Sequence, residues 1–248
     1  MYKLLFSIKI ISYIIFIFAL FIKLSLSSDN TLKEANILFD KGEYLESVNL
    51  ASENLSIESY IFRARTLAIY GHFLLDSKEA LKVFKQAKEL AFLALDVDIF
   101  DDNAHVEAAH AMGRYSQLIG IVSALKEGYA EKISFHLDEA IKINANNVSA
   151  QISKGTWHAE IVDKAGFMAN ILYGATSDQA REHYENALNL DKENIGFLFE
   201  ISYGLYLLDS KEDRVKAKIL LSKVIEAEPK NHLDELYIEK AKNLIKEL

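Results

Sequence analysis

One packing pattern limits the fold more strongly than any other feature of the chain. A small residue, a bulky one and a second small one follow each other at helical spacing, most clearly at Ala180, Tyr184 and Ala187. Small residues let two helices approach closely, and the bulky residue fills the space between them. The pattern therefore predicts pairs of tightly packed helices.

Further copies of this pattern recur at the spacing of a repeat. From Ser47 to Ala80 the distance is 33 residues, against about 34 for tetratricopeptide repeats, of which the pattern is typical. Later copies are spaced more widely, with 53 residues from Ala80 to Ile133, 47 from Ile133 to Ala180 and 37 from Ala180 to Ala217. The predicted packing residues are Ala80, Phe84, Ala87, Ala140, Ala180, Tyr184, Ala187, Ala217 and Leu221.

We therefore predict an all-α, tetratricopeptide-type helical-repeat superhelix over residues 28–248, with about five helix pairs. A final amphipathic helix from His232 to Leu248 would cap its open end. Part of the extra spacing predicts two lengthened central helices, Ala104 to Lys126 and Val148 to about Tyr173, each longer than six turns. Their overhang would wall a deeper central pocket. The single proline, Pro229, agrees with long helices, because proline interrupts helix interiors.

The first 27 residues predict a secretory signal peptide. Lys3 and Lys9 precede an apolar run from Ile10 to Ile22, and small residues follow, with cleavage expected after Ser27 and Ser28 as the near alternative. The other interpretation is an uncleaved anchor over residues 4–22, which is about long enough to span a bilayer. The chain has no cysteine, which excludes a lipoprotein signal, disulfides and a thiol nucleophile.

The charge balance disfavours one class of partner. Without the leader, 25 basic residues stand against 36 acidic ones, a net charge of about −11. An acidic body does not suit the phosphate backbone of a nucleic acid. We therefore expect no nucleic-acid binding, and contact with a membrane only through the N-terminal segment if it is uncleaved.

No motif predicts catalysis, a metal site or a cofactor. His105 and His110 flank Glu107, but they are five residues apart, about 140° around a helix, so one ion is hard to reach from both. The stretch from Asp96 to Glu107 has the length of a calcium loop, yet Phe100 takes a ligand position. A connector that caps the following helix is the favoured interpretation. We therefore predict that the chain is not an enzyme.

The most unusual local composition surrounds Trp157, the only tryptophan. Its ring either packs in the core, as aromatics at helical spacing usually do, or belongs to a binding groove. In the second interpretation the groove would contain Trp157, His158, Glu160 and Lys164 on one helix, and Arg114, Tyr115 and Gln117 on its neighbour. Glu160 and Lys164, four residues apart, would pair along the helix surface.

The segment from Asn146 to Asp209 resembles a known family. The runs Gly155–Glu160, Tyr173–Ala175 and Tyr184–Leu190 look like the tetratricopeptide-repeat T components associated with TRAP transporters. That resemblance implies a periplasmic, non-enzymatic helper that docks a solute-binding protein. A more distant resemblance, to the helical-repeat domain of regulators of microtubule dynamics, would place the domain in the cytosol behind an uncleaved anchor.

Together these features predict a periplasmic or secreted interaction scaffold whose concave face holds a helix or loop of a partner protein, most simply an envelope protein. The alternatives are a carrier of a small apolar ligand between the two long helices, and a membrane-anchored helical-repeat adaptor.

Overall fold

The computed structural model describes residues 30–248, and the predicted leader and anchor lie outside them. The described residues are helical, and no strand occurs among them. After a helical segment at residues 30–40, the helices are α2 (Tyr44–Ala51), α3 (Ile57–Leu74), α4 (Ser77–Val97), α5 (Asp102–Leu118), α6 (Ile121–Lys126), α7 (Tyr129–Ile143), α8 (Val148–Ala165), α9 (Met168–Tyr173), α10 (Ser177–Leu190), α11 (Ile195–Leu208), α12 (Lys211–Glu226) and α13 (His232–Leu244).

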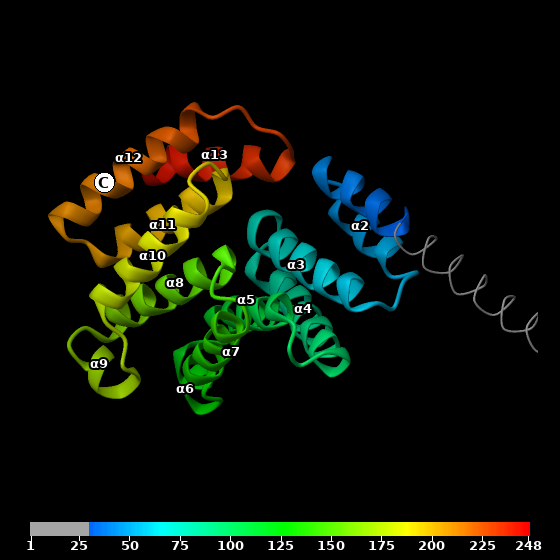
Figure 1. Cartoon of the computed structure of the whole chain (residues 1–248), viewed down its shortest axis with the longest axis horizontal. Coiled ribbons are helices and arrows are strands. Elements are labelled where there is room, and N and C mark those ends of the chain that lie inside the picture. Colours follow the sequence, from blue (N-terminus) through cyan, green and yellow to red (C-terminus); the bar gives the residue numbers. More distant parts are fainter. Residues whose placement is uncertain (1–29) are drawn as a thin grey trace, which may run out of the picture.

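The helices pair in chain order and stack in two layers (Figure 1). α3 packs on α4, α5 on α7, α8 on α10, and α11 on α12. The first helices of these pairs also contact one another in series, from α3 through α5 and α8 to α11, and α13 continues the series. They form the inner layer of a curved stack. The predicted all-α, tetratricopeptide-type superhelix is confirmed.

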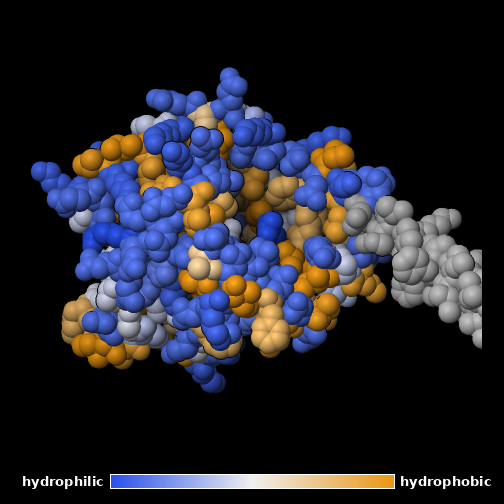
Figure 2. All heavy atoms as spheres, viewed as in Figure 1, coloured by the Kyte–Doolittle hydropathy of each residue, from blue (hydrophilic) through white to orange (hydrophobic). Residues whose placement is uncertain are grey.

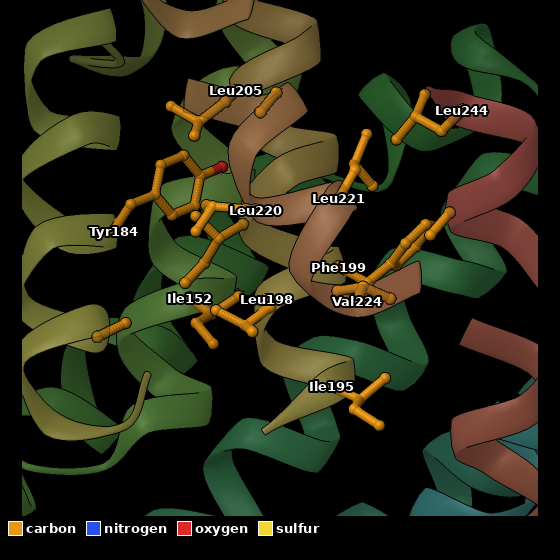
Figure 3. Close-up of a cluster of buried hydrophobic side chains, with 14 of the residues drawn as sticks. Ile152, Tyr184, Ile195, Leu198, Phe199, Leu205, Leu220, Leu221, Val224 and Leu244 are labelled. Atoms are coloured by element: carbon orange, nitrogen blue, oxygen red, sulfur yellow. The ribbon is translucent and has the colours of Figure 1, made fainter. Parts of the chain in front are cut away.

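All nine predicted packing residues are buried. In two of the helix pairs the helices pack more closely than an alanine at the contact would allow. A glycine on the first helix lies directly against the aromatic ring of the second helix. A Cβ atom on Gly71 would lie 2.6 Å from the Phe84 ring, and one on Gly155 would lie 2.6 Å from the Tyr184 ring. Tyr184 sits in the largest apolar cluster, against Ile152 and Leu205 (Figure 3). Glycine and aromatic together therefore define the seam.

The prediction of two unbroken central helices is wrong in its extent. α5 ends at Leu118 and α8 at Ala165, and the short helices α6 and α9 follow. Gly120 has a φ of 85° and Gly166 a φ of 54°, values that L side chains rarely adopt and that end a right-handed helix. The residues expected to prolong the helices fold instead as two separate projections.

Side-chain caps fix where most helices begin. Asp101, for example, accepts a hydrogen bond from the Ala104 N–H at 2.8 Å, at the start of α5. This confirms the interpretation that the acidic connector caps the following helix. Asp76, Asn147, Thr176, Asn194, Ser210 and Asn231 cap α4, α8, α10, α11, α12 and α13 in the same way.

The last helix reaches back to the first repeats. The Tyr237 ring of α13 packs edge-on against Phe73 of α3, with ring centroids 5.1 Å apart, and Lys240 Nζ lies 5.7 Å from the centroid of the same phenylalanine. The inner helices α3, α5, α8, α11 and α13 thus surround the concave face, and the contact of Phe73 with Tyr237 joins the two ends of this series. Among residues 30–248, no helix combines the length and the apolar character needed to cross a bilayer.

Candidate functional site

Three of the predicted groove residues meet on the concave face between α5 and α8. Gln117 Nε2 donates a hydrogen bond to Glu160 Oε1 at 3.0 Å. The second oxygen of the same carboxylate accepts one from Lys164 Nζ at 2.8 Å. The predicted pairing of Glu160 with Lys164 is therefore present, and Gln117 extends it to the neighbouring repeat.

Arg114, also predicted, joins a second polar group that spans three repeats. Its Nη2 lies 3.9 Å from Glu200 Oε1 on α11, and the Tyr237 hydroxyl of α13 donates to the same Glu200 oxygen at 3.4 Å. The Arg114 and Glu200 side chains are 28% and 23% exposed. A pair that is this long and partly exposed to solvent can exchange partners at little cost in free energy.

Glu200 was not predicted from the sequence. Its signal is nonetheless visible, because it is the one charged residue of α11, in the run Ile195–Leu208. A charge in an otherwise apolar helix marks the side that faces solvent or a partner.

On the α3 side of the groove, His72 lies near two cations, Arg114 and Lys240. Burial, followed by the charges of Arg114 and Lys240, lowers the pKa of His72 to about 3, so this ring is neutral. A small cavity of about 130 Å³ opens here, lined by Gly71, His72, Leu75, Ser77, Ala80, Phe84, Arg114, Gln117 and Leu118. Drug-sized ligands need about 300–1,000 Å³, so this cavity suits a single side chain of a larger partner.

Three predicted groove residues lie elsewhere. Trp157 is 8% exposed, packs against Ala109 and Leu137, and donates from Nε1 to the Ala130 carbonyl oxygen at 2.9 Å. Tyr115 packs beside Tyr129, against the buried cluster that α3, α4 and α5 form. A core position of this kind stabilises an indole, because the ring is buried and its N–H still has a hydrogen-bond acceptor. Trp157 and Tyr115 are therefore removed from the candidate groove.

His158 is also buried rather than in the groove. Its Nδ1 accepts a hydrogen bond from the Thr176 N–H at 3.3 Å, and its ring stacks on His183 with centroids 5.7 Å apart. Burial, with the charges of Lys154 and His183, lowers the pKa of His158 to about 4. An accepting Nδ1 requires a neutral ring, which agrees with this shift.

A buried lysine, which sequence reasoning missed, joins α7 to α8. Lys154 Nζ lies 2.7 Å from Asp138 Oδ1, donates to Ser134 Oγ at 2.7 Å, and lies 4.7 Å from the Trp157 ring centroid. A second cavity of about 360 Å³ adjoins it, lined by Glu131, Ser134, Phe135, Asp138, Trp157, Leu172 and Tyr173. This cavity belongs to α7, α8 and α9, not to the space between α5 and α8.

His110 Nδ1 lies 3.5 Å from Glu107 Oε2, but His105 does not join them. The Glu107 carboxylate is buried and accepts a hydrogen bond from Arg65 Nε at 2.8 Å, whereas His105 Nδ1 lies 2.9 Å from His136 Nδ1. Within residues 30–248, no group of three or more histidine, cysteine, aspartate or glutamate side chains is placed to hold a metal ion.

The fold and the groove together define a tetratricopeptide-type helical-repeat protein. The chain belongs to the family described as regulator of microtubule dynamics protein 1-3, whose family profile matches residues 31–248. The predicted resemblance to the T components of TRAP transporters is not confirmed by the comparisons.

The solved structures that are similar to the chain include two tetratricopeptide-repeat proteins. One is a thermophilic tetratricopeptide-repeat protein, TTC0263 of Thermus thermophilus, with a TM-score of 0.61 and 16% identity over 87% of this chain and 99% of that one. The other is YrrB, described as a tetratricopeptide-repeat protein with an unusual peptide-binding site, with a TM-score of 0.38 and 16% identity over 85% and 90%. The first shows the same fold. No curated protein matched the chain.

Proposed function

We propose that this protein is a non-enzymatic interaction scaffold that holds an extended, polar segment of a partner protein along its concave face. The observation that carries the proposal is the contact of α13 with α3 through Tyr237 and Phe73. This contact bounds the concave face on a second side. A groove that is bounded in this way accommodates an extended peptide segment more readily than the surface of a globular domain. Helical repeats typically bind their partners on such extended concave faces.

The chemistry of the groove supports a segment with charges of both signs. Arg114 and Lys164 present cations, and Glu160 and Glu200 present carboxylates. Each pair is partly exposed, so a partner that supplies the opposite charge can replace one contact with another of similar strength. Charge complementarity of this kind sets the register of a bound segment more than its affinity.

An apolar carrier is less well supported. The apolar ligand was expected between α5 and α8. Two polar contacts occupy this space: the Gln117–Glu160 hydrogen bond, and a contact of 2.6 Å between His110 Nε2 and Ser153 Oγ. Apolar ligands bind where few polar groups must be desolvated.

Two cellular locations of the scaffold remain as more specific proposals. Family membership supports a membrane-anchored adaptor, held by residues 4–22, that serves the microtubule-related processes for which the family is named. The other version is an exported scaffold that docks a solute-binding protein of a TRAP-type transporter in the periplasm. The intact mass of protein from its native source separates them, because a chain that begins at Met1 is anchored and one that begins at Ser28 or Asp29 is exported.

The scaffold is tested by cross-linking in the native source with two matched variants. Glu160→Ala combined with Lys164→Ala removes an ion pair of the groove, and Glu139→Ala combined with Lys142→Ala removes an exposed pair on α7, on the outer layer. The proposal expects a cross-linked partner that the groove variant loses and the α7 variant retains. A partner set unchanged in both variants would show that the groove is not the binding surface.

A further inference from the structure

Two short helices at one edge of the superhelix expose most of their apolar side chains. α6 buries none of its residues, and α9 buries only Ala169. The exposed fractions are 67% for Ile121, 77% for Val122, 57% for Leu125, 83% for Phe167, 71% for Ile171 and 59% for Leu172. Exposed apolar groups of this size on a folded domain mark a surface that something else covers.

The backbone holds these two tips outward. Gly120 and Gly128 bracket α6, and Gly166 and Gly174 bracket α9, all four with positive φ. Each tip connects the first helix of a pair to the second, α5 to α7 and α8 to α10, so both project from the same edge in consecutive repeats (Figure 1). Apolar atoms are visible at the α9 tip, at the lower left of Figure 2.

We propose that α6 and α9 insert their apolar side chains into the interfacial region of a lipid bilayer. A protein partner would need a matching pocket for each of two separate, convex tips. A bilayer is fluid and takes up both, as it does the apolar faces of interfacial helices.

The charges around the tips set the lipid preference. Lys126 is followed by Glu127 at the end of α6, and the run from Gly166 to Ser177, which contains α9, has no charged residue. Because these charges balance, attraction to anionic headgroups adds little. Uncharged phosphatidylcholine bilayers are therefore sufficient for insertion.

The N-terminal sequence also indicates that the chain comes into contact with a membrane. The apolar run from Ile10 to Ile22 takes the chain to a membrane in both interpretations, as a retained anchor or as a leader for export. The tips are a surface different from the concave groove, so this inference does not depend on the proposed scaffold.

The absence of cysteine from the chain allows a site-specific test on the full-length protein. Single variants Val122→Cys on α6 and Ile171→Cys on α9 are labelled with the environment-sensitive dye NBD and mixed with phosphatidylcholine vesicles. The matched control is Ile219→Cys on α12, where the natural side chain is 54% exposed. All three proteins keep the N-terminal run, so its own affinity for vesicles cancels in the comparison.

The proposal expects blue-shifted emission and an intensity gain of about two-fold or more at both tips, with no change at Ile219. Adding Phe167→Ser should reduce the response of the label at Ile171. Equal responses at the tips and at Ile219, or no response at the tips, would overturn the proposal. A blue shift that grows with protein concentration before vesicles are added would assign the tips to a second copy of the chain instead.

Discussion

The Tyr44 hydroxyl lies 3.1 Å from Nδ1 of His232, and this contact joins the first helix pair to the last helix across 188 residues of sequence. Gly42 lies against the same imidazole, because a Cβ atom on it would be 2.6 Å from His232 Nδ1. Helical repeats are ordinarily stabilised by contacts between neighbours alone. Here the two ends of the stack are also coupled to each other.

Tyr44→Phe should lower the free energy of unfolding by about 1 kcal/mol, because it removes one hydrogen bond from a buried hydroxyl. The loss should be accompanied by faster hydrogen exchange in α13, although the substitution is in α2. Urea denaturation and exchange mass spectrometry measure the two effects.

The control for this variant is Tyr206→Phe. The Tyr206 hydroxyl also donates to a distant residue, Glu247 at 3.1 Å, but at the surface, and its loss should cost less than about 0.5 kcal/mol. Exchange in α13 that is unchanged in Tyr44→Phe would mean that the end-to-end contact does not hold this helix in place.

Gly155→Ala should destabilise the fold, since its methyl group would lie 2.6 Å from the Tyr184 ring and 3.1 Å from the Ala180 carbonyl oxygen. Overpacking of this kind costs about 1–3 kcal/mol. Gly113→Ala is the matched control on the neighbouring helix, because a Cβ atom there would meet nothing within 4 Å. It should stabilise by about 0.5–1 kcal/mol through helix propensity. Melting temperatures that move in the same direction for both variants would contradict this account of the seam.

The sequence was sufficient to predict these seams because their signal is local. Ala180, Tyr184 and Ala187 are spaced at helical intervals, and burial on one face follows from that spacing. The ends of α5 and α8 were missed for the same reason, since apolar periodicity continues beyond Gly120 and Gly166 and gives no sign of their positive φ.

The groove was only partly predictable. Gln117 and Glu160 lie on neighbouring repeats, and the regular stacking of repeats brings them together. The Glu200–Tyr237 contact and the closure of α13 on α3 depend on the overall curvature of the stack. Curvature is the sum of small rotations at each repeat, and no single stretch of sequence encodes it.

Arg181→Lys should weaken the ion pair that links α10 to α12. Arg181 makes a two-pronged contact with the buried Asp213 carboxylate, Nε to Oδ1 at 3.0 Å and Nη2 to Oδ2 at 2.8 Å. Lysine cannot reproduce this geometry, and we expect a loss of about 1 kcal/mol in the free energy of unfolding. Arg214→Lys is the control, because Arg214 pairs with a single oxygen of exposed Asp209 and such surface pairs contribute about 0–1 kcal/mol. Equal losses in both variants would contradict the two-pronged geometry as the cause.

Stability should fall as the pH is lowered from about 6.5 to about 4, because three histidines are held neutral in the folded chain. Burial is the first cause in each case, and it lowers the pKa of His72 to about 3 and the pKa values of His136 and His158 to about 4. In the unfolded chain these rings bind protons near pH 6.5. The unfolded state therefore binds more protons than the folded state across this pH window. The stability that these neutral histidines contribute is complete above about pH 6.5 and is lost as the pH falls towards about 4.

For His158 the expected loss at about pH 5 is on the order of 1–2 kcal/mol. Urea denaturation at about pH 7.5 and about pH 5 measures the loss in the natural chain, and His158→Asn should show a smaller difference between the two conditions. In the natural chain, the Thr176 N–H donates a hydrogen bond to His158 Nδ1 at 3.3 Å. Asparagine also offers a side-chain acceptor for this N–H, but it takes up no proton. If the variant instead lost as much stability on acidification as the natural chain, His158 would not be among the groups whose protonation opposes folding.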